Sequence, residues 1–177
     1  MTTPFRFCPS CATPLEALSQ LEDGGLKARL RCPSCDFTHW NNPTPVLAAV
    51  VEYEGRILLA RNAAWPAHMF ALITGFMEAG ETPQSGIERE IAEETSLVTH
   101  SLDLIGVYDF QRMNQVIIAY HAVCSGKVAL SPELLDYRLI EFDKLQCWPA
   151  GTGYALADWL RSRGHDPVFV EWDKRAK

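Results

Sequence analysis

The stretch that most constrains this chain covers residues 75–97, GFMEAGETPQSGIEREIAEETSL. Its first seven residues are rich in glycine, which is typical of a loop. Thr82 is a favourable N-cap and Pro83 suits the first helical position, so we predict that a helix begins there. Ile87 and Ile91 lie four residues apart and give this helix a buried stripe.

The polar side of the predicted helix carries three glutamates, Glu90, Glu93 and Glu94, at positions i, i+3 and i+4. They occupy one arc of about a third of the helix surface. Like charges at this spacing repel by about 0.2–0.5 kcal/mol per pair. A divalent cation in front of them would reverse that effect, because clustered carboxylate oxygens are the ligands that Mg²⁺ or Mn²⁺ prefers. The alternative is a solvated, charge-rich helix.

Two neighbours of the glutamates bear on this choice. Gly86 lies on the same arc, one turn before Glu90, and is expected to leave room for another backbone to approach the metals. Arg89 lies one turn before Glu93, so it can pair with that carboxylate or reach back to Glu81 and fix the loop.

These offsets resemble the Nudix box, in which Gly, five residues, Glu and seven residues precede Arg-Glu-apolar-x-Glu-Glu. Gly75, Glu81 and Arg89-Glu90-Ile91-Ala-Glu93-Glu94 match it in this chain. Ser96 stands where the family usually has a glycine, which leaves the end of the helix open. The resemblance covers about residues 45–164. It implies an α/β (α+β) fold, an α/β/α sandwich around a mixed sheet.

Four cysteines form two Cys-Pro-Ser-Cys pairs separated by twenty residues, namely Cys8, Cys11, Cys32 and Cys35. Two such knuckles suit a tetrahedral Zn²⁺ site, and we predict a structural zinc ribbon over 1–40. Two disulfides or four incidental thiols are the alternatives. The ribbon has few apolar residues, so the metal is expected to supply its stability. It is also compatible with a homodimer.

Composition narrows the class of protein. The 177 residues carry a net charge of −6 and include 47% hydrophobic residues, enough for a sizeable core. The absence of a basic run argues against nucleic acid as the main partner. No apolar run reaches the ~18 residues of a membrane span, and no leader is evident at Met1. We therefore expect a cytoplasmic protein.

The remaining elements follow from periodicity and turn signals. The prolines at 43 and 45 predict a linker over 41–45, followed by a catalytic domain over 46–177. Strands are predicted over 46–52 and 56–60 as a hairpin, and then over 70–74, 102–108 and 114–123, with a loop over 109–113. A strand or extended segment follows over 133–142, and a closing helix over 154–161.

With its ribbon, the chain is similar to the zinc-ribbon Nudix hydrolases, which include NADH, FAD and ADP-ribose pyrophosphatases. The resemblance implies Mg²⁺-dependent (or Mn²⁺-dependent) hydrolysis of a nucleoside diphosphate derivative. Its implied metal ligands are Glu90, Glu94 and Glu93, with a backbone carbonyl of Gly75 or Phe76. Glu81 and Arg89 would hold the loop against the helix.

A further carboxylate is needed as a base or an additional ligand. Glu133 opens the segment ELLDYRLI, which resembles in part a segment that follows the Nudix box. We therefore place Glu133 in this role, with Asp136 as the rival. An exposed loop glutamate is the alternative.

Substrate recognition is assigned to aromatic and basic residues expected near the cleft. The candidates are Phe76, Tyr108 and Phe110 for stacking and Arg61 and Arg112 for phosphate or base contacts, although each aromatic residue also suits the core.

The proline-rich signature of NADH pyrophosphatases is missing from residues 108–115, so we expect broad dinucleotide specificity. A non-catalytic nucleotide sensor, or a nucleic-acid-associated ribbon protein, is the alternative function.

Overall fold

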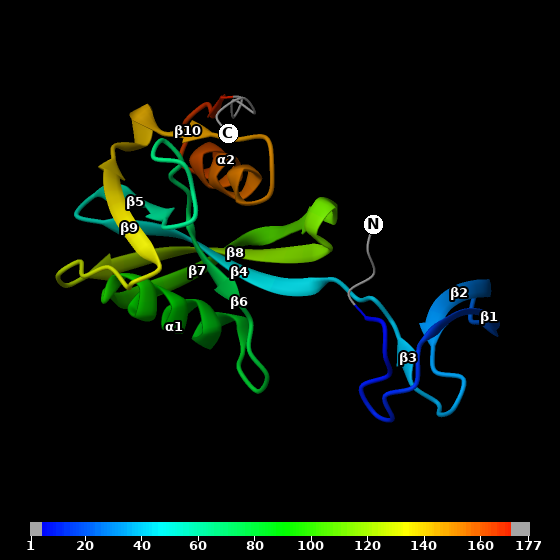
Figure 1. The fold of residues 1–177 in the computed structure, drawn as a ribbon. Coiled ribbons are helices and arrows are strands. Elements are labelled where there is room, and N and C mark those ends of the chain that lie inside the picture. The colour runs from blue at the N-terminus through cyan, green and yellow to red at the C-terminus, as the bar shows by residue number, and fades with distance from the viewer. Residues whose placement is uncertain (1–4, 171–177) are drawn as a thin grey trace. The chain divides into compact units, whose positions relative to one another are not determined.

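The computed structural model describes residues 5–170, and the chain divides into two compact units, Met1–Asn42 and Pro43–Lys177 (Figure 1). The first unit is a small antiparallel sheet of β1 (Glu16–Glu22), β2 (Gly25–Arg31) and β3 (Thr38–His39). Its strands are mostly exposed, and its buried residues among those described are Cys8, Arg31 and Cys32. This unit therefore lacks an apolar core.

The second unit is built on a mixed six-stranded sheet in the order β7-β8-β4-β5-β9, with β6 paired to β4. Its strands are β4 (Thr44–Tyr53), β5 (Arg56–Asn62), β6 (Ile73–Phe76), β7 (Val98–Phe110), β8 (Gln115–Ser125) and β9 (Leu134–Ile140). β4 and β8 run parallel, and the other pairs are antiparallel. A short parallel pair, β10 (Gln146–Cys147) and β11 (Val168–Phe169), lies outside this sheet.

Two helices cover the two faces of the sheet (Figure 1). The central strand β4 alternates: Leu47 and Val51 pack with α1 (Pro83–Thr95), whereas Val50 packs with α2 (Thr152–Ser162). All three side chains are fully buried, as expected for a strand covered on both faces. The predicted α/β/α sandwich is confirmed. Within residues 5–170, no helix is long and apolar enough to span a membrane.

The hairpin of β4 and β5 follows the prediction, with Glu54 and Gly55 at positive φ in its turn. The predicted strand over 70–74 is shifted, since β6 covers Ile73–Phe76 and Ala71 makes only an isolated bridge to Ala60. The predicted loop over 109–113 is shorter than expected. β7 continues through Phe110, and a 3₁₀ turn (Gln111–Met113) joins it directly to β8.

Helix α1 begins as predicted, because the Thr82 hydroxyl accepts from the Ser85 N–H and Pro83 occupies the first turn. Ser96 ends the helix in the left-handed conformation that a glycine would favour, with φ 60°. Its hydroxyl donates to the Ala129 carbonyl at 3.1 Å. Two N–H groups of the loop 126–132 also cap the helix end, so this loop is docked on α1.

Candidate active site

The glutamates of α1 lie against strand β6 through a glycine. A Cβ built on Gly75 would fall 1.8 Å from the Glu90 carboxyl carbon, far inside any allowed contact. Gly75 is therefore required for the Glu90 carboxylate to rest on the β6 backbone. The side chain of Glu90 is 13% exposed, whereas that of Glu93 on the outer side of the helix is 61% exposed.

Arg89 connects the loop of residues 77–81 to this carboxylate face. Its guanidinium donates to both carboxylate oxygens of Glu81, at 3.2 and 3.1 Å, and to Glu90 and Glu93 at 2.9 and 3.0 Å. It also donates to the Phe76 carbonyl at 3.2 Å. One cation thus holds three carboxylates and the end of β6 together.

Gly86 serves this same loop rather than the approach of a backbone to metals, which corrects our expectation. A Cβ there would lie 2.5 Å from the Glu81 carboxylate and from the Leu47 side chain. The missing side chain gives the Glu81 carboxylate its place on the helix. From there Glu81 accepts from the Glu78 N–H at 2.6 Å.

The carboxylates differ in their electrostatics. Arg89 lowers the pKa of Glu81, mainly through its hydrogen bonds. Burial raises the pKa of Glu90. Burial, with the charges of Glu90, Glu133 and Glu93, raises the pKa of Glu94 to about 7. The inner face of α1 therefore holds ionised carboxylates at a cost that a bound cation would relieve.

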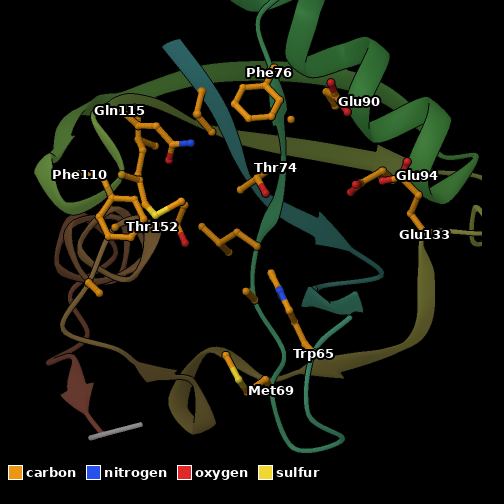
Figure 2. Close-up of a pocket in the computed structure, with 18 of the residues that line it drawn as sticks. Trp65, Met69, Thr74, Phe76, Glu90, Glu94, Phe110, Gln115, Glu133 and Thr152 are labelled. Carbon is orange, nitrogen blue, oxygen red and sulfur yellow. The ribbon is translucent and has the colours of Figure 1, made fainter. Parts of the chain in front are cut away.

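Glu133 lies beside Glu94, across the end of α1. It follows the loop 126–132, whose Ser131 N–H donates to the Glu94 carbonyl at 3.0 Å. Glu133 lines the cleft in front of α1 (Figure 2). The rival Asp136 does not line this cleft, and its carboxylate accepts from the Tyr137 N–H at the sheet edge. The positions of the two side chains therefore favour Glu133 over Asp136 as the further carboxylate of the site.

A cleft of about 750 Å³ opens between these carboxylates and the rest of the second unit. Three predicted substrate contacts line it: Phe76, Phe110 and Arg112. Phe76 is 59% exposed, and the Arg112 guanidinium lies over the Phe110 ring. The Phe76 ring is therefore open to a ligand, whereas the Phe110 ring is partly buried and carries the Arg112 guanidinium over one face.

Two other predicted contacts are withdrawn, because neither Tyr108 nor Arg61 lines the cleft. Tyr108 faces α2, where its hydroxyl donates to Asp158 at 3.0 Å. Arg61 is partly buried on β5, with its Nε enclosed.

Several cleft residues were not predicted from the sequence, among them Trp65, Met69, Gln115, Trp148 and Thr152. Trp65 and Met69 come from the connection between β5 and β6, and Thr152 begins α2. Figure 2 shows Trp65 and Met69 on one side of the cleft and Phe110, Gln115 and Thr152 on another. Their signal in the sequence is weak, since a Trp-Pro pair in a loop has no periodicity.

The carboxylates fit a hard divalent cation by their donor chemistry. They offer only oxygen ligands, and burial raises the pKa of both Glu90 and Glu94, an effect that a bound cation would oppose. Among the described residues, however, no three of these carboxylates bring ligand atoms within 4.8 Å of one another.

The four cysteines of the first unit, unlike the carboxylates, bring their ligand atoms close enough together to share one metal ion. One ligand atom from each of Cys8, Cys11, Cys32 and Cys35 lies within 4.8 Å of the others. Their closest sulfur pairs are 3.4, 3.6 and 3.8 Å apart. A ZnS₄ tetrahedron with Zn–S bonds of about 2.3 Å needs sulfurs about 3.8 Å apart. The thiols remain free, and none is in a disulfide.

Comparison with known proteins identifies the family. The NUDIX domain family matches residues 42–160, and the Nudix N-terminal zinc-ribbon family matches residues 6–41. A protein of Stutzerimonas stutzeri named NAD-capped RNA hydrolase NudC is 27% identical over 152 residues, which are 85% of this chain and 53% of that protein. The chain therefore spans about half the length of this relative.

Two solved structures share the fold. A NUDIX hydrolase from Nitrosomonas europaea aligns with a TM-score of 0.73 and 23% identity, over 95% of this chain and 100% of the other. An ADP-ribose pyrophosphatase from Streptococcus suis aligns with a TM-score of 0.58 and 16% identity, over 73% and 100%. Because the NUDIX domain covers more than half of its residues and follows a ribbon of its own family, this chain belongs to the Nudix family.

Proposed function

We propose that this chain hydrolyses the pyrophosphate bond of nucleoside diphosphate derivatives in a reaction that depends on Mg²⁺. The observation that carries the proposal is the placement of Glu90, Glu94 and Glu133 on one wall of a cleft of about 750 Å³. The preferred substrates are ADP-containing molecules such as ADP-ribose, FAD and NADH, with AMP as a product.

Each residue of the site has a proposed role in this hydrolysis. Glu90 and Glu94 would hold Mg²⁺, with Glu93 third and a backbone carbonyl at Gly75 or Phe76. Bound Mg²⁺ neutralises the diphosphate and lowers the pKa of a water molecule. Glu133 accepts the proton of the water that attacks phosphorus, while the bridging P–O bond breaks. Arg89 and Glu81 keep the loop and helix in register.

The four cysteines are proposed to hold a structural Zn²⁺. Four thiolates would fill the coordination positions of a tetrahedral Zn²⁺, so this site would leave none for a substrate. Catalysis is therefore assigned to the glutamates alone. A homodimer stays a proposal that sedimentation velocity tests.

The experiment is a panel of ADP-ribose, FAD and NADH at fixed Mg²⁺, with products separated by chromatography. We expect AMP from each, and ADP-ribose or FAD to react at least as efficiently as NADH. A preference for NADH above ~100-fold, about 2.7 kcal/mol of transition-state binding, would falsify the broad specificity. A nucleotide sensor would bind these compounds and release no AMP from any of them.

A second candidate comes from the name of the NudC relative, which acts on NAD-capped RNA. The net charge of −6 argues against a long phosphate-binding surface on this chain. An RNA oligonucleotide with a 5′ NAD cap, compared with free NAD⁺, distinguishes the two. Faster cleavage of the capped RNA would favour the RNA substrate.

A further inference from the structure

The cleft is lined by a second group of apolar side chains that the proposed chemistry does not use. It is formed by Trp65 and Met69, and the buried residues Ala71, Leu72 and Trp148 also line the cleft. We call this surface the Trp65 recess. Trp65 and Met69 are only partly buried, so an aromatic ring and a thioether remain open to the cleft. Both groups favour contact with a planar ring.

The Trp65 recess is held in a fixed place. The Trp65 N–H donates to the Asn62 carbonyl and the Met69 N–H to the Pro66 carbonyl, both at 3.0 Å. The Ala63 N–H donates to the backbone carbonyl of Glu133 at 2.8 Å. The loop that carries Trp65 is therefore tied to the segment that carries Glu133.

The Trp65 side chain is only partly buried in the protein core. It packs at the margin of the buried cluster that includes Leu59, Phe70 and Trp148. Figure 2 shows the side chains of Trp65 and Met69 directed toward the cleft. Phe76 lies at the opposite end of the view, with Thr74 between Phe76 and Trp65. A tryptophan in this setting presents a large rigid surface to a ligand.

The cleft thus carries aromatic side chains in two separate places, away from the wall that holds the glutamates (Figure 2). Phe76 and Phe110 line one of these places and the Trp65 recess forms the other. A substrate with one ring would leave one of them bare. A dinucleotide, in which the diphosphate joins two ribosyl groups that each carry a ring, matches both places.

We propose that the Trp65 recess binds the second ring of a dinucleotide, so that this cleft is built for dinucleotides with a ring at each end. The inference rests on the proposed function, because it assumes that the diphosphate lies at the glutamates. It assigns Trp65 and Met69 as specificity-determining residues. They would contact the half of the dinucleotide that is released with the second phosphate, while the adenosine half is released as AMP.

NAD⁺ and ADP-ribose test this directly, because they differ only by the nicotinamide ring. The quantity measured is the ratio of kcat/KM for NAD⁺ to kcat/KM for ADP-ribose. Stacking of a base on an aromatic side chain is worth about 1–3 kcal/mol, or ~5- to 150-fold. Trp65→Ala should therefore lower the ratio by about 5-fold or more, and Trp65→Phe should restore it to within about 3-fold of the wild-type value.

Two further variants complete the design. Trp40→Ala removes an exposed tryptophan of the ribbon unit and should leave the ratio unchanged. Met69→Ala should lower the ratio by about 2-fold or more. This variant provides the test of the recess if Trp65→Ala does not fold. Equal losses for NAD⁺ and ADP-ribose in Trp65→Ala, or in Met69→Ala, would overturn the second ring site.

Binding measurements separate this inference from the proposed function. In a Glu94→Gln background, calorimetry gives the affinities of NAD⁺ and ADP-ribose without turnover. Weaker binding of NAD⁺ relative to ADP-ribose after Trp65→Ala supports the recess, even if the wild-type protein cleaves neither compound. An unchanged affinity ratio overturns the recess, even if both compounds are cleaved.

Discussion

The two candidate metal sites of this chain are organised in opposite ways. The thiols of the ribbon converge on one point with their ligand atoms within 4.8 Å, in a unit that has almost no apolar core. The glutamates of α1 rest on a well-packed sheet and are held by Arg89 instead of converging. We therefore expect the fold of the ribbon to depend on a bound ion, whereas the second unit is folded by its core and its carboxylates are proposed to serve the chemistry.

Removing one carboxylate should break the second site without affecting the fold. Glu94→Gln or Glu90→Gln takes away a proposed metal ligand, and we expect kcat to fall by ~10²-fold or more. Circular dichroism should show an unchanged fold, because the core of Ile87 and Ile91 is not altered. Near-normal turnover in both variants would remove these residues from the metal site.

Arg89 tests whether the internal cation organises the glutamates. Arg89→Ala should raise the Mg²⁺ concentration for half-maximal rate, or lower kcat, by about 10- to 100-fold, as for other groups that orient metal ligands. Arg89→Lys should recover only part of the loss, because a single ammonium cannot span Glu81, Glu90 and the Phe76 carbonyl. Full recovery by lysine would show that charge alone matters. The Mg²⁺ concentration for half-maximal rate is the measurement.

The ribbon should respond to the loss of a ligand in the opposite way. Cys32→Ser should release zinc and loosen residues 1–40, with the second unit still folded. AMP release should stay within about 2-fold of the wild-type rate, since zinc supplies no open coordination position. Elemental analysis and limited proteolysis measure the two effects. Wild-type protein without zinc would contradict the metal ribbon.

The smallest expected effect concerns stability without Mg²⁺. Burial raises the pKa of Glu94 to about 7, so its ionisation destabilises the fold as pH rises from the unfolded pKa through that value. Glu94→Gln removes this charge and should raise the melting temperature at pH 8 by about 2–4 °C, or roughly 1 kcal/mol. The difference from wild type should shrink by pH 5. A lower melting temperature at pH 8 would contradict it.

The sequence and the structure agree where one local pattern decides the outcome. The cap at Thr82, the stripe of Ile87 and Ile91, and the spacing of the glutamates all depend on neighbours within one helix. The α/β/α sandwich, by contrast, was implied by the resemblance of these offsets to the Nudix box. Ser96 also ends α1 where the family has glycine, because its hydroxyl gains the Ala129 carbonyl.

The rest of the site depends on contacts between distant segments. The carboxylate of Glu90 rests on Gly75, and the orientation of Tyr108 depends on Asp158, fifty residues away. Trp65 and Met69 reach the cleft through a loop whose turns carry no periodic signal. The strand over 70–74 was displaced because pairing with β4, rather than hydrophobicity, sets the bounds of β6.

The most direct test of the contrast between the two metal sites uses zinc-replete protein with and without Mg²⁺. AMP release from ADP-ribose is followed after dialysis that removes Mg²⁺ and leaves zinc, with zinc content measured in parallel. We predict no release until Mg²⁺ or Mn²⁺ is restored, at an unchanged zinc content. Full activity in the zinc-replete, Mg²⁺-free protein would contradict the assignment of catalysis to the glutamates.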